Sequence, residues 1–299
     1  MNKPSLSTSD VKDTISAAQQ ISNYAQAAVT LVPNLTDIPQ WYKQISVDIT
    51  TTKDHAQNWL DVLCPDATLH LPRTITAFNP TFQSNISKIQ SILSSAENGN
   101  VSAEQKTQIN NLFDSILSAL KVQQNVTDSI TKKLKDFIVK ANADQATLSN
   151  DLNTIKSNDQ VDADGILAIQ SVMTDHFMNN TILGPCNVIV SLDINVSIKI
   201  NQINSKPHVL AYAFISQFVD HMISNIKAIQ VPLQSFYDLW NTMILDYQTV
   251  IEDLNSASAD DYVNVIESLD LNQAKKDWQA LADFVKQSLP QEGHSIINN

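Results

Sequence analysis

The chain has 299 residues, of which 43% are hydrophobic, 17% are charged and only 4 are glycine. Compact α/β enzymes need glycine for tight turns and close ligand approach, so this scarcity favours long regular elements. The net charge of -12 argues against a nucleic-acid partner, because phosphate binding requires clustered Lys and Arg. It also argues against electrostatic attraction to an anionic membrane, so any membrane contact must be driven by apolar surface.

The first part of the chain predicts three helices separated by prolines. The cap candidates Ser7–Ser9 precede helical spacing over residues 8–32, which Pro33 ends. A second helix is expected over residues 36–63. The stretch between Pro65 and Pro80 is expected to be irregular, because Pro72 excludes it from a central strand, and a third helix follows over residues 81–97.

The most regular pattern begins at Ser102 and Gln105, which form a plausible capping box. No proline or glycine follows until Gly165, which predicts a helix of more than ~50 residues, about 80 Å long. Such a helix must pack lengthwise against other long helices. Its expected apolar stripe consists of Ile109, Leu112, Ile116, Leu120, Ile130, Leu134, Phe137, Ala141, Leu148, Leu152 and Ile155.

A second long helix is expected over residues 208–254, after Pro207. It begins with the nearly all-apolar segment VLAYAFISQFV, residues 209–219, and Pro232 should kink it. A last helical segment is expected from about Ser258 through Val285.

Residues 188–200, VIVSLDINVSIKI, break the helical pattern. Apolar side chains fall on every second position, which is typical of a strand with one apolar face. A single strand is not stable alone, but residues 181–183 would pair with it across the Gly184-Pro185 turn as a small hairpin. Its apolar face needs cover, which the chain offers at residues 209–219 and at Phe177 and Met178.

These elements predict a mainly α fold: an elongated bundle of four to five long helices, with a small β-tongue or hairpin head inserted between two long central helices. We expect residues 1–160 and 207–299 to form the helical tail and residues 161–206 to form the head, within a single continuous structural unit.

No motif indicates an enzyme, a cofactor or a metal. The phosphate-binding, dinucleotide-binding, zinc-protease and nucleophile-elbow patterns do not occur, and the histidines are not spaced for joint ligation. Carboxylate pairs such as Asp260-Asp261 sit at expected helix ends, where they serve as caps or solvated faces. We therefore expect no catalytic, cofactor-binding or metal-binding residues.

Cys64 and Cys186 are far apart and belong to no CxxC motif. Two free, partly buried thiols and one disulfide are both compatible with this spacing, and the sequence leaves the choice open. The N-terminus is polar and has no apolar core of a secretory signal. Either the protein stays inside the cell, or it leaves without an evident cleaved signal peptide, or a signal is not part of this sequence.

The alternating segment has two interpretations. It is either a constitutive strand that caps the bundle, or a conditional membrane head that is shielded until the protein meets lipid or a partner. Its seven alternating apolar side chains would contribute on the order of 10 kcal/mol if wholly transferred to an apolar environment. That energy suffices either to drive insertion or to hold a closed form.

The long helix over residues 102–155, the tongue-like segment 181–200 and the return helix from His208 together resemble the α-helical pore-forming toxins. This family includes cytolysin A and the tripartite relatives of the haemolysin BL and non-haemolytic enterotoxin type. The resemblance implies a secreted soluble form that rearranges, inserts its head into target-cell membrane lipid and oligomerises with itself or with partner subunits. The expected head residues are Ile182, Leu183, Val188, Val190, Leu192, Ile194, Val196, Ile198, Ile200, Val209, Leu210 and Phe214.

The head departs from that of a self-sufficient pore former. Polar residues, among them Asp193 and Lys199, interrupt the tongue, and residues 209–219 are too short to cross about 30 Å of hydrocarbon. The resemblance therefore favours a component of a multi-subunit toxin over a toxin that lyses alone. The alternative is a non-toxic helical scaffold or interaction protein with a constitutive cap strand.

Overall fold

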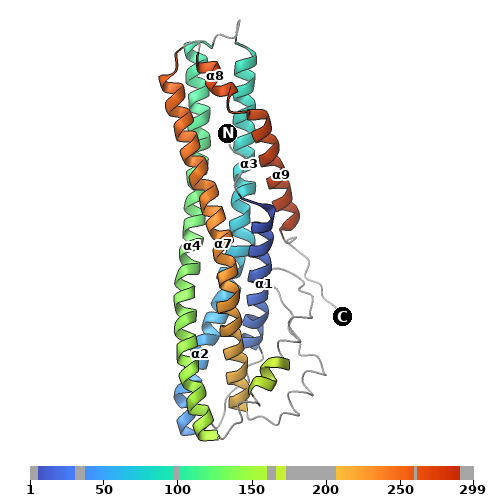
Figure 1. Ribbon diagram of the computed structural model, residues 1–299, viewed down its shortest axis with the longest axis vertical. Helices are drawn as coiled ribbons and strands as arrows, with labels where there is room; N and C mark the ends of the chain where they lie inside the picture. The colour runs from blue at the N-terminus through green and yellow to red at the C-terminus, as the bar shows by residue number, and fades with distance from the viewer. Residues whose placement is uncertain are drawn as a thin grey trace. The chain divides into compact units, whose positions relative to one another are not determined.

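A computed structural model describes residues 6–30, 38–96, 101–159, 166–172, 207–258 and 261–289. Within these ranges every regular element is helical, which confirms the predicted mainly α fold. The predicted β-tongue lies outside the described residues. The elements are α1 (Thr8–Thr30), η1 (Gln40–Tyr42), α2 (Lys43–Asn58), the π-helical η2 (Trp59–Leu63) and η3 (Asp66–His70), α3 (Leu71–Ser94), α4 (Ala103–Asp159), α7 (Pro207–Ser256), α8 (Asp261–Glu267) and α9 (Leu271–Ser288) (Figure 1).

The start of α4 follows the predicted capping box. The backbone N–H of Ser102 donates to Oε1 of Gln105 over 2.9 Å, and the N–H of Gln105 donates to Oγ of Ser102 over 3.2 Å. Two backbone donors that helix geometry leaves without partners are thereby satisfied. The helix then runs for 57 residues, so the prediction of one very long helix is confirmed.

The prediction of an irregular stretch before residue 81 is wrong. The chain passes through η3 and enters α3 at Leu71, with Pro72 in the first turn and Pro80 inside the helix. Proline is tolerated in a first turn because the N–H it lacks would have no helical partner there. Around Pro80, the helical path buries Phe78 and Phe82 fully. This burial stabilises the helix and offsets the backbone hydrogen bond that proline cannot donate.

The expected single C-terminal helix is also divided. Asp270 separates α8 from α9 in the left-handed conformation, with φ 45° and ψ 57°. Its Oδ1 accepts a hydrogen bond from the N–H of Gln273 over 3.3 Å and caps α9. This cap offsets the cost of a left-handed aspartate, a residue type that tolerates this region better than most.

The described chain belongs to two compact units, and α4 and α7 contribute residues to both. Unit 1 comprises Met1–Lys12, Leu69–Thr131 and Val231–Asn299, and unit 2 comprises Asp13–Thr68 and Lys132–Gln230. The predicted division into a tail and a head at residues 161–206 stays a prediction, since most of that range lies outside the described residues.

Unit 1 is held by an aromatic cluster where α3, α7 and α9 meet. The Phe78 ring centroid lies 4.9 Å from that of Trp278 in an edge-to-face arrangement, and Trp240 stacks on Trp278 at 5.9 Å. Polar side chains add bonds between α3 and α9, such as Nδ2 of Asn79 to Oε1 of Gln279 over 3.1 Å. Figure 1 shows these two helices side by side, as their contacts require.

Unit 2 has its own core around Trp59, which packs against Phe137 with ring centroids 5.6 Å apart. The indole Nε1 donates to Oγ of Ser22 over 3.0 Å, and that Oγ lies 3.1 Å from Sγ of Cys64. Cys64 is disulfide-bonded, which decides for this residue the question that the sequence left open. The other cysteine of the chain, Cys186, lies outside the described residues.

The Phe82→Ala substitution tests the unit 1 core. Phe82 is fully buried and its ring centroid lies 5.8 Å from that of Trp278, so its truncation should cost about 3–5 kcal/mol of unfolding free energy. Urea denaturation of the full chain measures the loss. Leu245→Ala in the same unit removes a side chain that is 55% exposed and should cost less than about 0.5 kcal/mol. Equal losses for the two variants would contradict the described core.

Candidate functional site

The first three turns of α7 carry those predicted head residues that the structure describes. Val209 and Phe214 are buried, at 2% and 1% exposure, and Leu210 is half-buried. Every other residue from 211 to 219 is buried as well. A helix that is apolar on all sides is normally buried, so the structure gives this segment the cover that its composition requires.

The other nine predicted head residues lie outside the described residues, and their role stays a prediction. They are Ile182, Leu183, Val188, Val190, Leu192, Ile194, Val196, Ile198 and Ile200.

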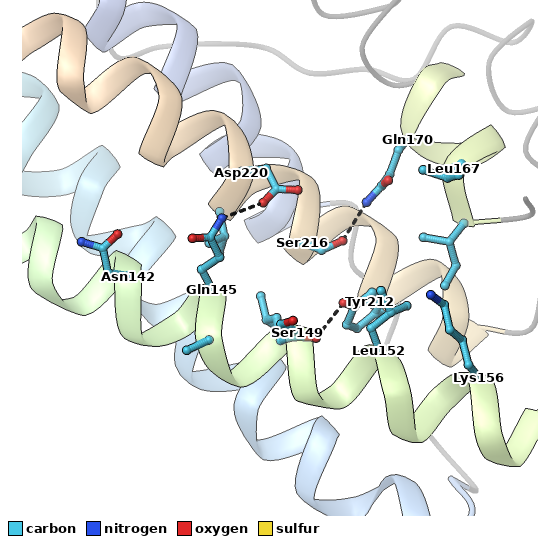
Figure 2. A pocket seen from close by; sticks show the side chains of 14 residues that line it. Asn142, Gln145, Ser149, Leu152, Lys156, Leu167, Gln170, Tyr212, Ser216 and Asp220 are labelled. Carbon is cyan, nitrogen blue, oxygen red and sulfur yellow. Dashed lines mark hydrogen bonds between the residues drawn. The ribbon is translucent and has the colours of Figure 1, made fainter. Parts of the chain in front are cut away.

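A pocket of about 540 Å³ lies in unit 2 between α4, the helical residues 166–172 and α7 (Figure 2). Its apolar lining consists mainly of Leu148, Leu152, Ile166, Leu167 and Val219. Leu152, which the sequence places in the apolar stripe of α4, instead lines this pocket and is half-buried.

The polar groups of the pocket bond to one another across the three segments. The Tyr212 hydroxyl donates to the carbonyl oxygen of Leu148 over 2.7 Å, and Nε2 of Gln170 donates to Oγ of Ser216 over 3.0 Å (Figure 2). Burial, with the negative charges of Asp151 and Asp220, raises the pKa of Tyr212, so its hydroxyl stays protonated and remains a donor. These bonds fix residues 166–172 and α4 to the start of α7.

The charged groups of the pocket are few. Among the described residues that line it, the charged side chains are Lys156 and Asp220, and Asp220 accepts a bond from Gln145 over 3.4 Å. The described residues also contain no group of three or more His, Cys, Asp or Glu side chains arranged to hold a metal ion. In the described part of the chain, no helix combines the length and hydropathy needed to cross a bilayer.

Sequence reasoning missed two buried carboxylates on α4, Asp144 and Asp151, each 7% exposed. Nδ1 of His55 on α2 lies 2.7 Å from Oδ2 of Asp144, across 89 positions of sequence. Burial raises the pKa of the Asp144 carboxyl, and the bond and charge of His55 oppose that rise. A signal was available: both aspartates occupy positions that the three-and-four spacing of α4 assigns to the buried stripe.

Comparisons with solved structures identify proteins that share this fold. No known family model matches the sequence, and no curated protein matches it. Solved structures do match, over nearly the whole of both chains. The Bacillus cereus HblL1 toxin component has a TM-score of 0.66 at 12% identity, covering 95% of this chain and 96% of that one.

Subunits of two tripartite toxins match as well. Soluble SmhA of the tripartite α-pore-forming toxin Smh from Serratia marcescens has a TM-score of 0.61 at 11% identity, over 94% of this chain and 92% of its own. Soluble AhlB of the tripartite α-pore-forming toxin AHL from Aeromonas hydrophila has a TM-score of 0.61 at 13% identity, over 94% and 91%. The chain therefore has the fold of the α-pore-forming toxin subunits, and the resemblance predicted from the sequence is confirmed.

The Tyr212→Phe substitution tests the contact that joins α7 to α4 in unit 2. Removing the hydroxyl leaves the ring in place but deletes the bond to the Leu148 carbonyl, so unfolding free energy should fall by about 1 kcal/mol. Urea denaturation measures the change. Tyr237→Phe, at a half-buried tyrosine on the same helix, is the matched control and should stay within about 0.5 kcal/mol of the parent. A loss at position 237 as large as that at 212 would refute the assignment.

Proposed function

We propose that this chain is a subunit of a multi-component α-pore-forming toxin. In this proposal the secreted soluble form binds or inserts into target-cell membranes through an amphipathic head and oligomerises with partner subunits to lyse cells. The observation that carries the proposal is the shared fold with subunits of two tripartite toxins and with HblL1, along nearly the whole chain.

The head of the proposed subunit combines residues 181–200 with the start of α7. Apolar residues occupy every second position of residues 188–200. As a strand, this segment would present one apolar face to lipid or a partner and its other face to water. The start of α7 holds buried apolar side chains, and keeping a large one from water is worth about 1.5–3 kcal/mol, so lipid would have to replace the cover that they have in the described form. The driving force is apolar, as the net charge of -12 requires.

The proposed dependence on partners has a direct test. Purified protein should not lyse red cells alone, and should lyse them when mixed with the products of its neighbouring genes. The physical reason is that Asp193 and Lys199 interrupt the apolar tongue, so partner subunits must complete the membrane-spanning wall.

Each other outcome of this haemolysis assay contradicts a defined part of the proposal. Lysis by the protein alone would keep the toxin function but refute the argument from the polar interruptions. No lysis in any mixture, together with no binding to lipid vesicles, would favour the helical scaffold with a constitutive cap strand.

The role of the alternating face is tested by vesicle flotation of paired variants. The parent protein should float with vesicles and stay bound at high salt, because apolar contact is not screened. The double substitution V190D and I194D should lower the bound fraction at least ~tenfold, since placing a carboxylate in hydrocarbon is costly.

The matched control places the same two charges on the alternate face as S191D and S197D. This control should retain most of the binding, because that face is proposed to meet water. Equal binding by all three proteins would contradict the head assignment, and equal loss in both double variants would contradict the assigned face.

A further inference from the structure

In unit 2, the part of α4 that contacts α2 carries two buried aspartates. Asp144 and Asp151 are two helical turns apart on α4, and each is 7% exposed. On α2, His55 is bonded to Asp144, and the charge of Asp48 acts on Asp151. His55 and Asp48 are also two turns apart on α2, so in an antiparallel arrangement Asp48 lies on the turn that corresponds to Asp151, as His55 lies on the turn that corresponds to Asp144.

The two pairs are electrostatically unequal. Asp144 has the imidazole of His55 at 2.7 Å and also feels the positive charge of Lys140. Asp151 has a buried Oδ2 that no described residue bonds, and the charge facing it from α2 is the negative one of Asp48. A buried carboxylate without a bonding partner or counter-charge is costly when ionised, and the usual relief is to take up a proton.

The neighbouring titratable groups of α7 do not compensate Asp151. Tyr212 is neutral, its hydroxyl donates to the Leu148 carbonyl, and Asp151 itself is among the causes of its raised pKa. Asp220 adds a second negative charge near Tyr212. Burial lowers the pKa of His221, whose ring stacks on Tyr24 of α1 with centroids 3.8 Å apart. The lowered pKa favours the neutral imidazole, which adds no positive charge to this side of the unit at neutral pH.

We propose that a proton controls the packing of α2 on α4: the contact is tight when Asp151 carries a proton, and it is loosened when Asp151 is charged. The inference does not rest on the proposed toxin function. It concerns the stability of the described conformation of unit 2, independently of any function.

The direction of the pH dependence follows from the folded and unfolded states. Burial first, and then the charge of Asp48, raises the pKa of Asp151 from 3.8 to about 6. The folded protein thus holds this proton more tightly than the unfolded chain, and the proton favours folding below the unfolded pKa. That stabilisation is lost as the pH rises from about 4 through about 6. The contribution of Asp151 therefore holds unit 2 more firmly in mild acid than at neutral pH, opposite in direction to ordinary acid denaturation.

The test compares four full-length proteins by urea denaturation at pH 5.0 and pH 7.5: the parent, D151N, D48N and D136N. Asp136 is an exposed aspartate on the α4 segment of the same unit, so D136N removes an equal charge without touching the pair. A change in unfolding free energy that is equal at both pH values reflects packing of the new amide. The informative quantity is the difference between the unfolding free energies at pH 5.0 and pH 7.5.

The expected result is a difference in pH dependence. One pKa unit is a tenfold change in an equilibrium constant, and the raised pKa lies about one unit above pH 5.0, so moving to pH 7.5 should cost the parent on the order of tenfold in its folding equilibrium relative to D151N. D48N removes only the facing charge and leaves Asp151 buried, so it should lose the smaller part of the same dependence, and it tests the pair if D151N folds poorly. D136N should follow the parent.

Hydrogen exchange locates the effect. After correction for the intrinsic pH dependence of exchange, amides of α2 should be up to about tenfold better protected at pH 5.0 than at 7.5 in the parent, and this difference should be clearly smaller in D151N. The proposal is overturned if D151N or D48N keeps the pH dependence of the parent. It is also overturned if the parent's change in protection is as large in α9 of unit 1 as in α2.

Discussion

The length of α4 is the constraint on which the rest of the structure depends. A helix of 57 residues is stable in water only if its apolar stripe is covered along its course, since helix propensity alone contributes little. The buried positions of α4 follow spacings of three, four or their sum, from Ile109 to Ile155. Several helices cover this stripe: α7, with 50 residues, contacts it through Tyr212, while Trp59 and His55 pack against other positions. Each unit is accordingly built on a part of α4 and a part of α7.

Within this stripe the polar exceptions are as informative as the apolar rule. Thr127, Asp144 and Asp151 are buried at positions that the spacing assigns to apolar side chains. Oγ1 of Thr127 and Oδ2 of Asp151 have no hydrogen-bond partner among the described residues. Polar groups of this kind weaken helix packing locally, so a stripe that contains them is held less firmly than an all-apolar one.

The proposed function requires a folded form that is stable yet able to rearrange. Domain stabilities are about 5–15 kcal/mol, and the alternating segment carries on the order of 10 kcal/mol of apolar transfer energy. Because the two quantities are comparable, membrane contact is able to offset the loss of soluble packing. Ionisation of Asp151 would act on the same balance from inside unit 2.

The sequence by itself determined the elements whose causes are local. The capping box at Ser102 and the unbroken periodicity after it predicted the start and length of α4, because neighbours along one helix decide both. The helical path through Pro80, the left-handed break at Asp270 and the disulfide at Cys64 were decided only in the tertiary structure. So was the meeting of His55 with Asp144, 89 residues away. Packing against distant segments sets the environment of these residues, and the pattern of one segment carries no record of which distant segment will cover it.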